Sequence, residues 1–509
     1  MRRWTLALAL AAACSSPKPD PHFPPGFLFG AAIAGFQVDM GCPTIPAEKC
    51  DDPNSDWYQF VTDPRMLAIK DQIGLSGDPP SDGPGFFELY PQDLARAKND
   101  AKLDAVRLSI EWSRIFPTST VGVNGYDALK AIASKDGIAY YHHIFATMKE
   151  LGLTPLVTLN HYTLPTWIDD GVGCHLDFNH CTKRGWLDPQ TVTEIAKYAG
   201  FCAQEFGGEV DLWATENEPL AVVIPGYLAP SPERLNPPAV WLAGGGTDAK
   251  IVMMHMIQAH AAMYDAVKQR DRQDADGDGI DSRVGLVYNM EPLYPKDPTN
   301  PDDVSAAKNG NYLYNQIYLD ATIQGQLDEN LDGHEVYHPE LANRMDFLGI
   351  NYYSRTVVAG LHGPDVPKFS PLLNIDPLSI QEEAYPRGIY EMVKFASDRY
   401  HVPIIITENG TGASGDGENQ VPCLVQHLEW LKRSIDEGAD VRGYFWWTLM
   451  DNYEWNHGMG PYKMGLWAVS KLDPAKPRTP RPIVGVYARI TTSREIPSDL
   501  AAQFPIGNP

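Results

Sequence analysis

Positive charge is scarce in this chain of 509 residues. It has 41 lysine and arginine residues against 65 aspartate and glutamate residues, so its formal net charge is -24 and its pI is near 4.9. A surface this acidic repels phosphate groups, which argues against nucleic-acid binding and against electrostatic binding to anionic lipid. We expect the acidic side chains to keep the surface solvated and the partner to be a neutral small molecule.

Cysteine is also rare, with seven residues in all, and no pair of cysteines has the spacing of metal ligands. The closely spaced ones form two pairs within loops, Cys42 with Cys50 and Cys174 with Cys181. In an exported protein such pairs predict two local disulfides. Cys202 and Cys423 are left as ordinary buried thiols or as the two ends of a long-range bridge, and the sequence leaves both readings open.

The apolar run at the N-terminus is too short to span a bilayer. Met1-Arg2-Arg3 precedes the apolar stretch Trp4 to Ala13, a pattern typical of an export signal. The stretch ends in Ala-Cys-Ser-Ser, which resembles a bacterial lipoprotein cleavage site with Cys14 as the lipidated residue. We therefore expect residues 1–14 to be the signal and residues 15–25 a flexible tether. The predicted product is a periplasmic or surface lipoprotein of the bacterial cell envelope; simple secretion is the alternative.

No linker divides the rest of the chain, and 43% of all residues are apolar, so one large domain is expected. We place this domain at residues 26–497 and a C-terminal tail at 498–509. Eight apolar runs, each read as a strand, alternate with stretches of helical spacing such as Val192 to Phe206. This order predicts a single (β/α)8 TIM barrel of the α/β class with extended rim loops. The predicted strands are 27–34, 106–110, 155–159, 210–214, 284–287, 347–350, 402–406 and 443–446.

Two glutamate motifs follow two of these strands. Thr215-Glu216-Asn217-Glu218-Pro219 comes after the fourth run and Thr407-Glu408-Asn409-Gly410 after the seventh. Chemistry in such barrels gathers where the strands end, so Glu218 and Glu408 should share one site. Two carboxyl groups in unlike surroundings can cleave an acetal, one as proton donor and one as nucleophile.

Several longer strings resemble glycoside hydrolase family 1, the retaining β-glycosidases, over residues 23–496. The matching segments are residues 27–32 with Gln37, 107–115, 159–165, the two glutamate motifs, 346–353 and 447–455. The resemblance implies that Glu218 is the acid/base and Glu408 the nucleophile. It also implies that Arg107 lies beside the nucleophile, where a cation would lower the nucleophile's pKa, and that Tyr353 donates a hydrogen bond to it.

The same resemblance implies a sugar-binding pocket and no cofactor. Asn217 matches the residue that holds the sugar 2-hydroxyl, and Trp447 matches the platform under the ring. The residues matching those that bind the outer hydroxyls are Gln37, His161, Glu454 and Trp455. A carboxylate at position 454 would repel a phosphate dianion, so we expect a non-phosphorylated sugar.

Some residues depart from the family pattern. Tyr162 stands where tryptophan or phenylalanine is usual, Glu216 replaces an apolar residue, and Met464 falls near an aromatic position. The segment 456–462 is one residue longer than usual. Glu216 is the oddest of these, since its carboxyl group could point outward or could perturb Glu218 by like-charge repulsion.

An acidic insertion, Asp274-Ala275-Asp276-Gly277-Asp278-Gly279, begins like a calcium-binding loop. Gly285 occupies the twelfth position, where the pattern calls for glutamate. A structural calcium site with Asp274, Asp276 and Asp278 and a solvated acidic loop are therefore both open.

The favoured function is a retaining exo-β-glycosidase that hydrolyses terminal β-glucosyl, β-galactosyl or β-fucosyl residues of a glycoside or oligosaccharide. One alternative is an endo-acting glucanase of the same barrel clan. Another is a non-catalytic surface carbohydrate-binding protein, but such a binder would not need both glutamates with Arg107 and Tyr353. Binding of the membrane is expected only through a lipid on Cys14, and the sequence does not predict the oligomeric state.

Overall fold

The computed structural model describes residues 20–361, 372–411, 417–460 and 462–507. The predicted signal, Cys14 and most of the predicted tether lie outside these ranges, so export and lipid attachment stay predictions. Within the described ranges, no helix combines the length and the apolar character that crossing a membrane requires.

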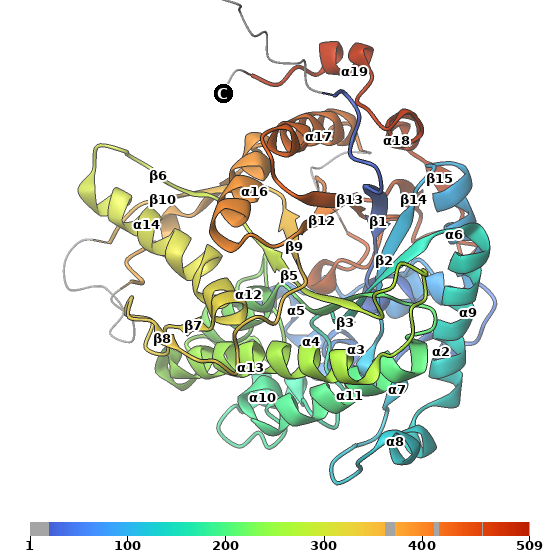
Figure 1. Ribbon diagram of the computed structural model, residues 1–509. Helices are drawn as coiled ribbons and strands as arrows, with labels where there is room; N and C mark the ends of the chain where they lie inside the picture. Colours follow the sequence, from blue (N-terminus) through green and yellow to red (C-terminus); the bar gives the residue numbers. More distant parts are fainter. Residues whose placement is uncertain (1–19, 362–371, 412–416, 461, 508–509) are drawn as a thin grey trace, which may run out of the picture.

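Eight parallel strands close into a barrel, as predicted, in the order β1-β13-β12-β9-β5-β4-β3-β2 (Figure 1). All eight apolar runs form strands of this barrel. The strand bounds are β1 Leu28–Ala32, β2 Ala105–Ser109, β3 Thr154–Asn160, β4 Leu212–Asn217, β5 Arg283–Asn289, β9 Phe347–Tyr352, β12 Ile404–Asn409 and β13 Val441–Trp447.

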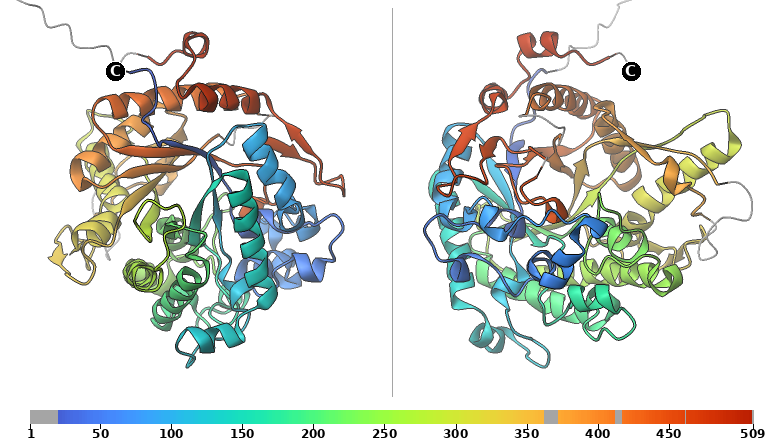
Figure 2. Two further views of the ribbon diagram at one scale, coloured as in Figure 1. Left: turned by 45° about the vertical axis from the view of Figure 1, so that its right-hand side comes forward. Right: turned by 180° about the vertical axis from the view of Figure 1, so that it is seen from behind.

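A helix follows each barrel strand and covers the outside of the barrel, as Figures 1 and 2 show. Their bounds are α6 Phe86–Asn99, α9 Lys135–Leu151, α11 Gln190–Phe206, α13 Thr247–Arg270, α14 Pro301–Asn315, α16 Arg387–Tyr400, α17 Gln420–Asp436 and α18 Pro482–Ser493. Their apolar faces pack against the outer face of the strands, so the main core lies between the two layers. A second apolar cluster, including Ala214, Val287 and Ile405, fills the barrel interior.

Additional strands lie in the connections outside the barrel. β6 Leu293–Pro295 follows β5, whereas β10 Arg355–Val358 and β11 Gln381–Glu383 follow β9, and together they form a three-stranded sheet. β14 Trp467–Val469 and β15 Arg478–Pro480 form a hairpin after β13, and β7 Gln326–Leu327 pairs with β8 Val336–Tyr337. Because two of these insertions follow strand C-termini, they extend the rim where the glutamate motifs lie.

Both ends of the described chain pack onto the barrel. Phe23 is buried, its backbone N–H donates to the carbonyl of Arg494 at 2.7 Å, and His22 forms a β-bridge with Glu495. Residues 20–25 were expected to be part of a flexible tether, but the burial of Phe23 and the backbone contacts of His22 and Phe23 hold this segment against the folded domain. Near the C-terminus, residues of the predicted tail form α19 Ser498–Gln503, which buries Leu500.

The structure contains both predicted disulfides, Cys42–Cys50 and Cys174–Cys181. Cys202 is buried in α11 and Cys423 is half-buried in α17, and both are free thiols. The long-range bridge between them, which the sequence left open, is therefore not formed. The Cys42–Cys50 bridge closes the loop that directly follows the short helix α1, Gly35–Val38.

Replacing Cys42 and Cys50 together by serine should lower the melting temperature. The closed loop is short, with a sequence separation of 8 residues, so the lost entropic stabilisation is about 2.5 kcal/mol. For a chain of this size that corresponds to a fall of about 2–3 °C by calorimetry. A reductant should lower the melting temperature of the wild type more than that of the double variant; equal effects on both would contradict a stabilising role of this bridge.

Candidate active site

The two glutamates lie at the C-terminal rim, at points where the strand pairing is irregular. Glu218 directly follows β4, and its φ of 44° lies in the left-handed region, which is sparsely populated for residues other than glycine. The β4–β5 register shifts between Ala214 and Asn217, and the β12–β9 register shifts between Ile406 and Glu408. Such irregularities redirect side chains at the ends of strands, and here they occur beside both carboxyl groups.

Arg107 and Tyr353 hold the carboxyl group of Glu408. Arg107 lies on β2, is fully buried, and donates from Nη1 to Glu408 Oε1 at 2.5 Å. The Tyr353 hydroxyl, which follows β9, donates to Glu408 Oε2 at 2.6 Å. Both oxygens of Glu408 therefore accept a hydrogen bond, and one of the donors is a cation.

The pKa of Glu408 is the net result of opposing effects. Burial raises it to about 7, and the nearby charge of Glu218 raises it further, while Arg107 and the Tyr353 hydrogen bond act in the opposite direction. Arg107 lowers this pKa, as predicted, but desolvation outweighs the ion pair and leaves the pKa above its ordinary value. When one proton is shared between the two carboxyl groups, Arg107 still favours the negative charge on Glu408.

A chain of hydrogen bonds joins the two glutamates and fixes the orientation of two side-chain amides. Arg107 can only donate, so its bond from Nη2 at 2.6 Å identifies the contacted atom of Asn217 as Oδ1. Asn351 Nδ2 then donates to this oxygen at 3.2 Å and to Glu218 Oε1 at 2.6 Å. The Thr407 hydroxyl donates to Asn351 Oδ1 at 2.7 Å. Glu218 Oε1 consequently faces a group that donates only.

The same chain fixes the tautomer of His161. Asn217 presents its Nδ2 to His161 Nε2 at 3.3 Å, so Nε2 must accept and the ring proton must lie on Nδ1. Burial and the charge of Arg107 hold the pKa of His161 well below its usual range, so the ring is neutral. Its Nδ1 is buried and has no hydrogen-bond partner among the described residues. His161 thus offers one unused donor.

Gln37 offers an unused acceptor. Its Nε2 donates to Glu454 Oε2 at 2.9 Å, and Asn452 Nδ2 donates to the same oxygen at 2.9 Å. Gln37 Oε1 is buried without a hydrogen-bond partner in the described part of the chain. A buried polar atom costs free energy when it is unpaired, so Gln37 Oε1 and His161 Nδ1 indicate a polar ligand.

Aromatic rings complete the site. The His161 ring is nearly parallel to those of Trp447 and Trp455, each with a centroid distance of 5.9 Å and an interplanar angle of 12°. Tyr162 contacts Trp455 at a centroid distance of 4.8 Å. Apolar planes beside hydroxyl-binding groups are the surroundings that a sugar ring requires.

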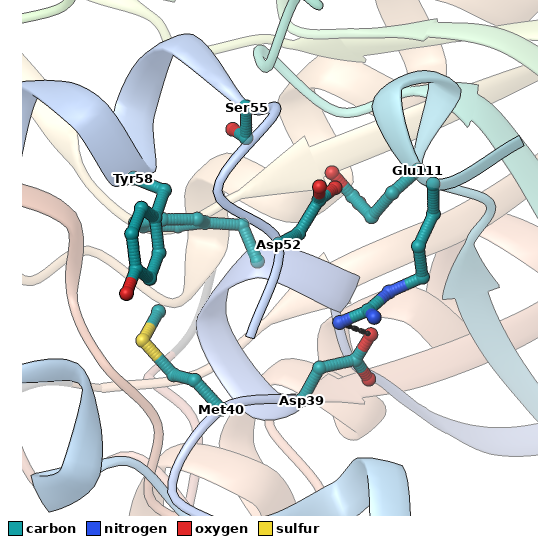
Figure 3. Close-up of a pocket in the computed structure, with 8 residues that line it drawn as sticks. Asp39, Met40, Asp52, Ser55, Tyr58 and Glu111 are labelled. Carbon is teal, nitrogen blue, oxygen red and sulfur yellow. Dashed lines mark ion pairs between the residues drawn. The ribbon is translucent and has the colours of Figure 1, made fainter. Parts of the chain in front are cut away.

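The helix that carries Gln37 is packed against a buried polar cluster. The backbone N–H of Gly35 donates to Ser109 Oγ at 2.7 Å, and a Cβ at Gly35 would lie only 2.7 Å from the Glu111 side chain. The lining of a small cavity beside this helix includes three acidic side chains, those of Asp39, Asp52 and Glu111. Asp39 forms an ion pair with Arg114 at 3.2 Å, and Figure 3 shows Asp52 turned toward Glu111. Burial raises the pKa of Glu111 to about 7. This cluster therefore packs against the helix that carries Gln37.

Glu216 points away from the barrel interior. Its side chain is fully buried, and Oε2 accepts a hydrogen bond of 2.5 Å from the hydroxyl of Tyr318 on α15, Ile317–Leu319. Burial raises the pKa of Glu216 to about 8, so it is neutral at pH 7. Of the two alternatives left by the sequence, the side chain takes the outward one, and a neutral group exerts no like-charge repulsion on Glu218.

The other departures from the family pattern lie around the rim. Tyr162 donates to Glu218 Oε2 at 2.6 Å. Met464 packs in the barrel interior, and its carbonyl accepts from Trp446 Nε1 at 3.0 Å. In the longer segment, Asn456 Nδ2 donates to the carbonyls of Gly74 and Pro232, each at 3.0 Å; residue 461 lies outside the described ranges.

The acidic insertion lies before β5, at the N-terminal end of the barrel strands. Asp274 and Asp276 bring carboxylate oxygens within 4.8 Å of Asp211, which precedes β4. Asp278 instead forms an ion pair with Arg283 at 2.5 Å. The predicted trio is therefore not brought together; calcium binding stays a prediction, and Asp211 would replace Asp278 in it.

Asn351 is the main site residue that the sequence interpretation missed. It lies near the end of β9 in the string Asn351-Tyr352-Tyr353, of which only Tyr353 was assigned a role. An asparagine directly after a buried apolar run was a usable signal, whereas Asn217 had been assigned its role only through the family resemblance.

The fold and these residues match known proteins. The family model described as glycosyl hydrolase family 1 matches residues 20–496. A beta-galactosidase of Pyrococcus woesei is 34% identical over 504 residues, which cover 90% of this chain and 94% of the relative. A 6-phospho-beta-glucosidase of Bacillus subtilis is 26% identical, with 86% and 90% of the two chains covered. The beta-glycosidase structure from Thermosphaera aggregans aligns with a TM-score of 0.79 and 28% identity, over 96% of this chain and 100% of that chain.

Replacing Glu216 by glutamine should increase stability at high pH more than at low pH. The pKa of Glu216 is about 8 in the folded state and near 4.5 in the unfolded chain. Between these values the folded state holds a proton that the unfolded state has lost. The free energy of unfolding therefore falls as pH rises, by up to about 1.4 kcal/mol per pH unit from this group.

Glutamine keeps an oxygen for the Tyr318 hydroxyl but cannot ionise. Between pH 5 and pH 8, the melting temperature of Glu216→Gln should therefore rise relative to that of the wild type. The exposed Glu150 provides a control, since Glu150→Gln should melt with the wild type at both values. A Glu216→Gln difference that is constant with pH would contradict the raised pKa, because it would mean that this carboxyl group is ionised to the same extent in the folded and unfolded states.

Proposed function

Because this chain belongs to glycosyl hydrolase family 1 and is therefore a β-glycosidase, we propose that it removes a terminal, non-phosphorylated sugar with retention of the anomeric configuration. The observation that carries this proposal is that two carboxyl groups joined by a chain of hydrogen bonds have different hydrogen-bond donors. Glu408 is paired with a buried cation, whereas both hydrogen bonds to Glu218 come from neutral donors.

In the first step, an oxygen of Glu408 forms a bond to the anomeric carbon while the glycosidic bond breaks. Glu218 transfers its proton to the departing oxygen, and Arg107 favours the ionised form of Glu408 before the attack. Asn217 supports this step because its amide group, fixed by Arg107, lies between the two carboxyl groups. There it can hydrogen-bond the sugar 2-hydroxyl.

In the second step, water attacks the anomeric carbon and the bond to Glu408 breaks. Glu218, now ionised, accepts the proton of that water, so the enzyme returns to its starting protonation state. Two inversions at one carbon give overall retention. An alcohol in place of water would give transfer of the sugar instead of hydrolysis.

The unpaired polar atoms support action on a terminal sugar. His161 Nδ1 can donate to, and Gln37 Oε1 can accept from, the outer hydroxyls of a single ring, and Glu454 offers further acceptor capacity beside Gln37. Such hydroxyl-binding groups around a single ring leave no place for a continuing sugar chain, which argues against an endo-acting enzyme. Glucosyl, galactosyl and fucosyl residues all present hydroxyls to this set.

The assignment of Glu408 and Glu218 can be tested with aryl β-glucosides. Glu408→Gln should lower kcat by at least about 10⁴-fold for every leaving group, because no nucleophile remains. Glu218→Gln should slow the first step strongly for leaving groups that need a proton, and little for dinitrophenolate, which needs none. The first product followed by NMR should be the β-anomer; an α-anomer, or equal loss for both leaving groups in Glu218→Gln, would contradict the proposal.

Phosphorylated substrates should be disfavoured by Glu454. Burial raises its pKa to about 7, so it is partly ionised at neutral pH, and two like charges 4 Å apart repel by several kcal/mol near a protein surface. We expect kcat/KM for a 6-phosphoglucoside to be at least about 100-fold below that for the plain glucoside.

Glu454→Gln should reduce the difference in kcat/KM between the plain glucoside and the 6-phosphoglucoside, since the substitution removes the charge but keeps an acceptor for Gln37. The matched control is Glu150→Gln, a surface substitution that should leave this difference unchanged. Turnover of the phosphorylated glucoside equal to that of the plain one in the wild type would overturn the proposed substrate class.

A further inference from the structure

We infer that Tyr162 is a positioning residue for the acid/base, stabilising its ionised form and orienting the oxygen that carries the transferred proton. This inference rests on the proposed role of Glu218. The Tyr162 hydroxyl donates to Glu218 Oε2 at 2.6 Å. Glu218 is 91% buried, so few other groups can solvate its charge.

The position of the proton follows from the orientation of the amides. Arg107 identifies Asn217 Oδ1, and Asn217 Oδ1 in turn identifies the Asn351 atom facing Glu218 as Nδ2. Nδ2 donates to Glu218 Oε1 and cannot accept, so a proton on Oε1 would clash with it. This contact favours the proton of neutral Glu218 on Oε2, which is the oxygen beside Tyr162.

A tyrosine hydroxyl suits both states of this oxygen because it can donate and accept. When Glu218 is ionised, the hydroxyl donates to Oε2; when Glu218 is protonated, the hydroxyl can accept from it or release the proton toward the substrate. Burial and the nearby carboxyl groups keep the pKa of Tyr162 well above its usual range, so the hydroxyl retains its own proton. Tyr162 therefore holds Oε2 without taking part as an acid.

The backbone and the neighbouring rings fix Tyr162 in this place. It follows β3 with a φ of 71°, in the left-handed region, and its ring packs on Trp455 at 4.8 Å and on His161 at 5.0 Å. Strained residues held by their surroundings are typical of functional positions. A phenylalanine or tryptophan here would keep an aromatic ring but could not offer a hydroxyl.

Other ionisable groups also face Glu218 and interact with its charge. They are Glu408 from β12, Tyr353 after β9, Tyr314 from α14, and Arg234 and Glu454 from rim loops. Of the residues that the structure describes, Tyr162 and Asn351 are the two whose side chains hydrogen-bond the carboxyl group of Glu218. Replacing Tyr162 by phenylalanine therefore removes one of these two hydrogen bonds and leaves the other in place.

The test is the pH dependence of kcat/KM for Tyr162→Phe on a phenyl β-glucoside. Loss of a hydrogen bond to the ionised form should move the alkaline limb upward by about one pH unit, since such a bond to a charged group has that magnitude. The acidic limb, which reports ionisation of Glu408, should stay in place. An alkaline limb that stays in place or moves downward would overturn the inference, whatever the change in maximal rate.

Incorporation of 3-fluorotyrosine at position 162 provides a nearly isosteric second variant. Its hydroxyl is a stronger donor, so the alkaline limb should move to lower pH, and an unmoved limb would again overturn the inference. Tyr198→Phe is the matched control, because its buried hydroxyl donates to the backbone carbonyl of Ile110, and both limbs should remain those of the wild type.

Glu218→Gln separates this inference from the proposed function. If Glu218→Gln turns over phenyl β-glucoside like the wild type, the acid/base assignment fails and the inference on Tyr162 fails with it. If Glu218→Gln is impaired as expected but Tyr162→Phe keeps the wild-type alkaline limb, the inference on Tyr162 alone is wrong.

Discussion

The guanidinium of Arg107 orders the whole reaction centre because it can only donate hydrogen bonds. One nitrogen neutralises Glu408 and another fixes the amide of Asn217. From that amide, the orientation of Asn351 and the tautomer of His161 follow without further choice. A single buried cation therefore determines which atoms of four neighbours donate and which accept.

Two acids separated by one residue have opposite surroundings. Glu216 faces the helix layer and meets one tyrosine, whereas Glu218 turns into the barrel mouth and meets Asn351 and Tyr162. Regular alternation along a strand would place residues 216 and 218 on the same face, so the difference arises where the strand ends. The register shift between Ala214 and Asn217 and the left-handed backbone of Glu218 turn its side chain to the other side. Neighbouring positions in the sequence can thus carry a neutral structural acid and a reactive one.

Most of the fold could be predicted from the sequence. Eight apolar runs alternate with helical spacing, and each run became a barrel strand because both of its faces are covered. Glu218 and Glu408 could be placed at one rim for the same reason. The pKa of Glu408 could not be predicted, since it depends on how far burial outweighs Arg107. The contact of Tyr162 with Glu218 depends on a left-handed backbone conformation after β3, which the hydrophobic periodicity of the sequence does not predict.

The irregular pairing at the ends of β4 and β12 has a consequence for how this architecture tolerates change. Below these points the β4–β5 and β12–β9 ladders are regular and help to hold the barrel together; above them the backbone departs from the register of its neighbours. The lower part of each of these strands therefore stabilises the barrel, and the upper end carries the reactive side chain. Variation in the upper segment can reshape specificity while the supporting cylinder keeps its geometry.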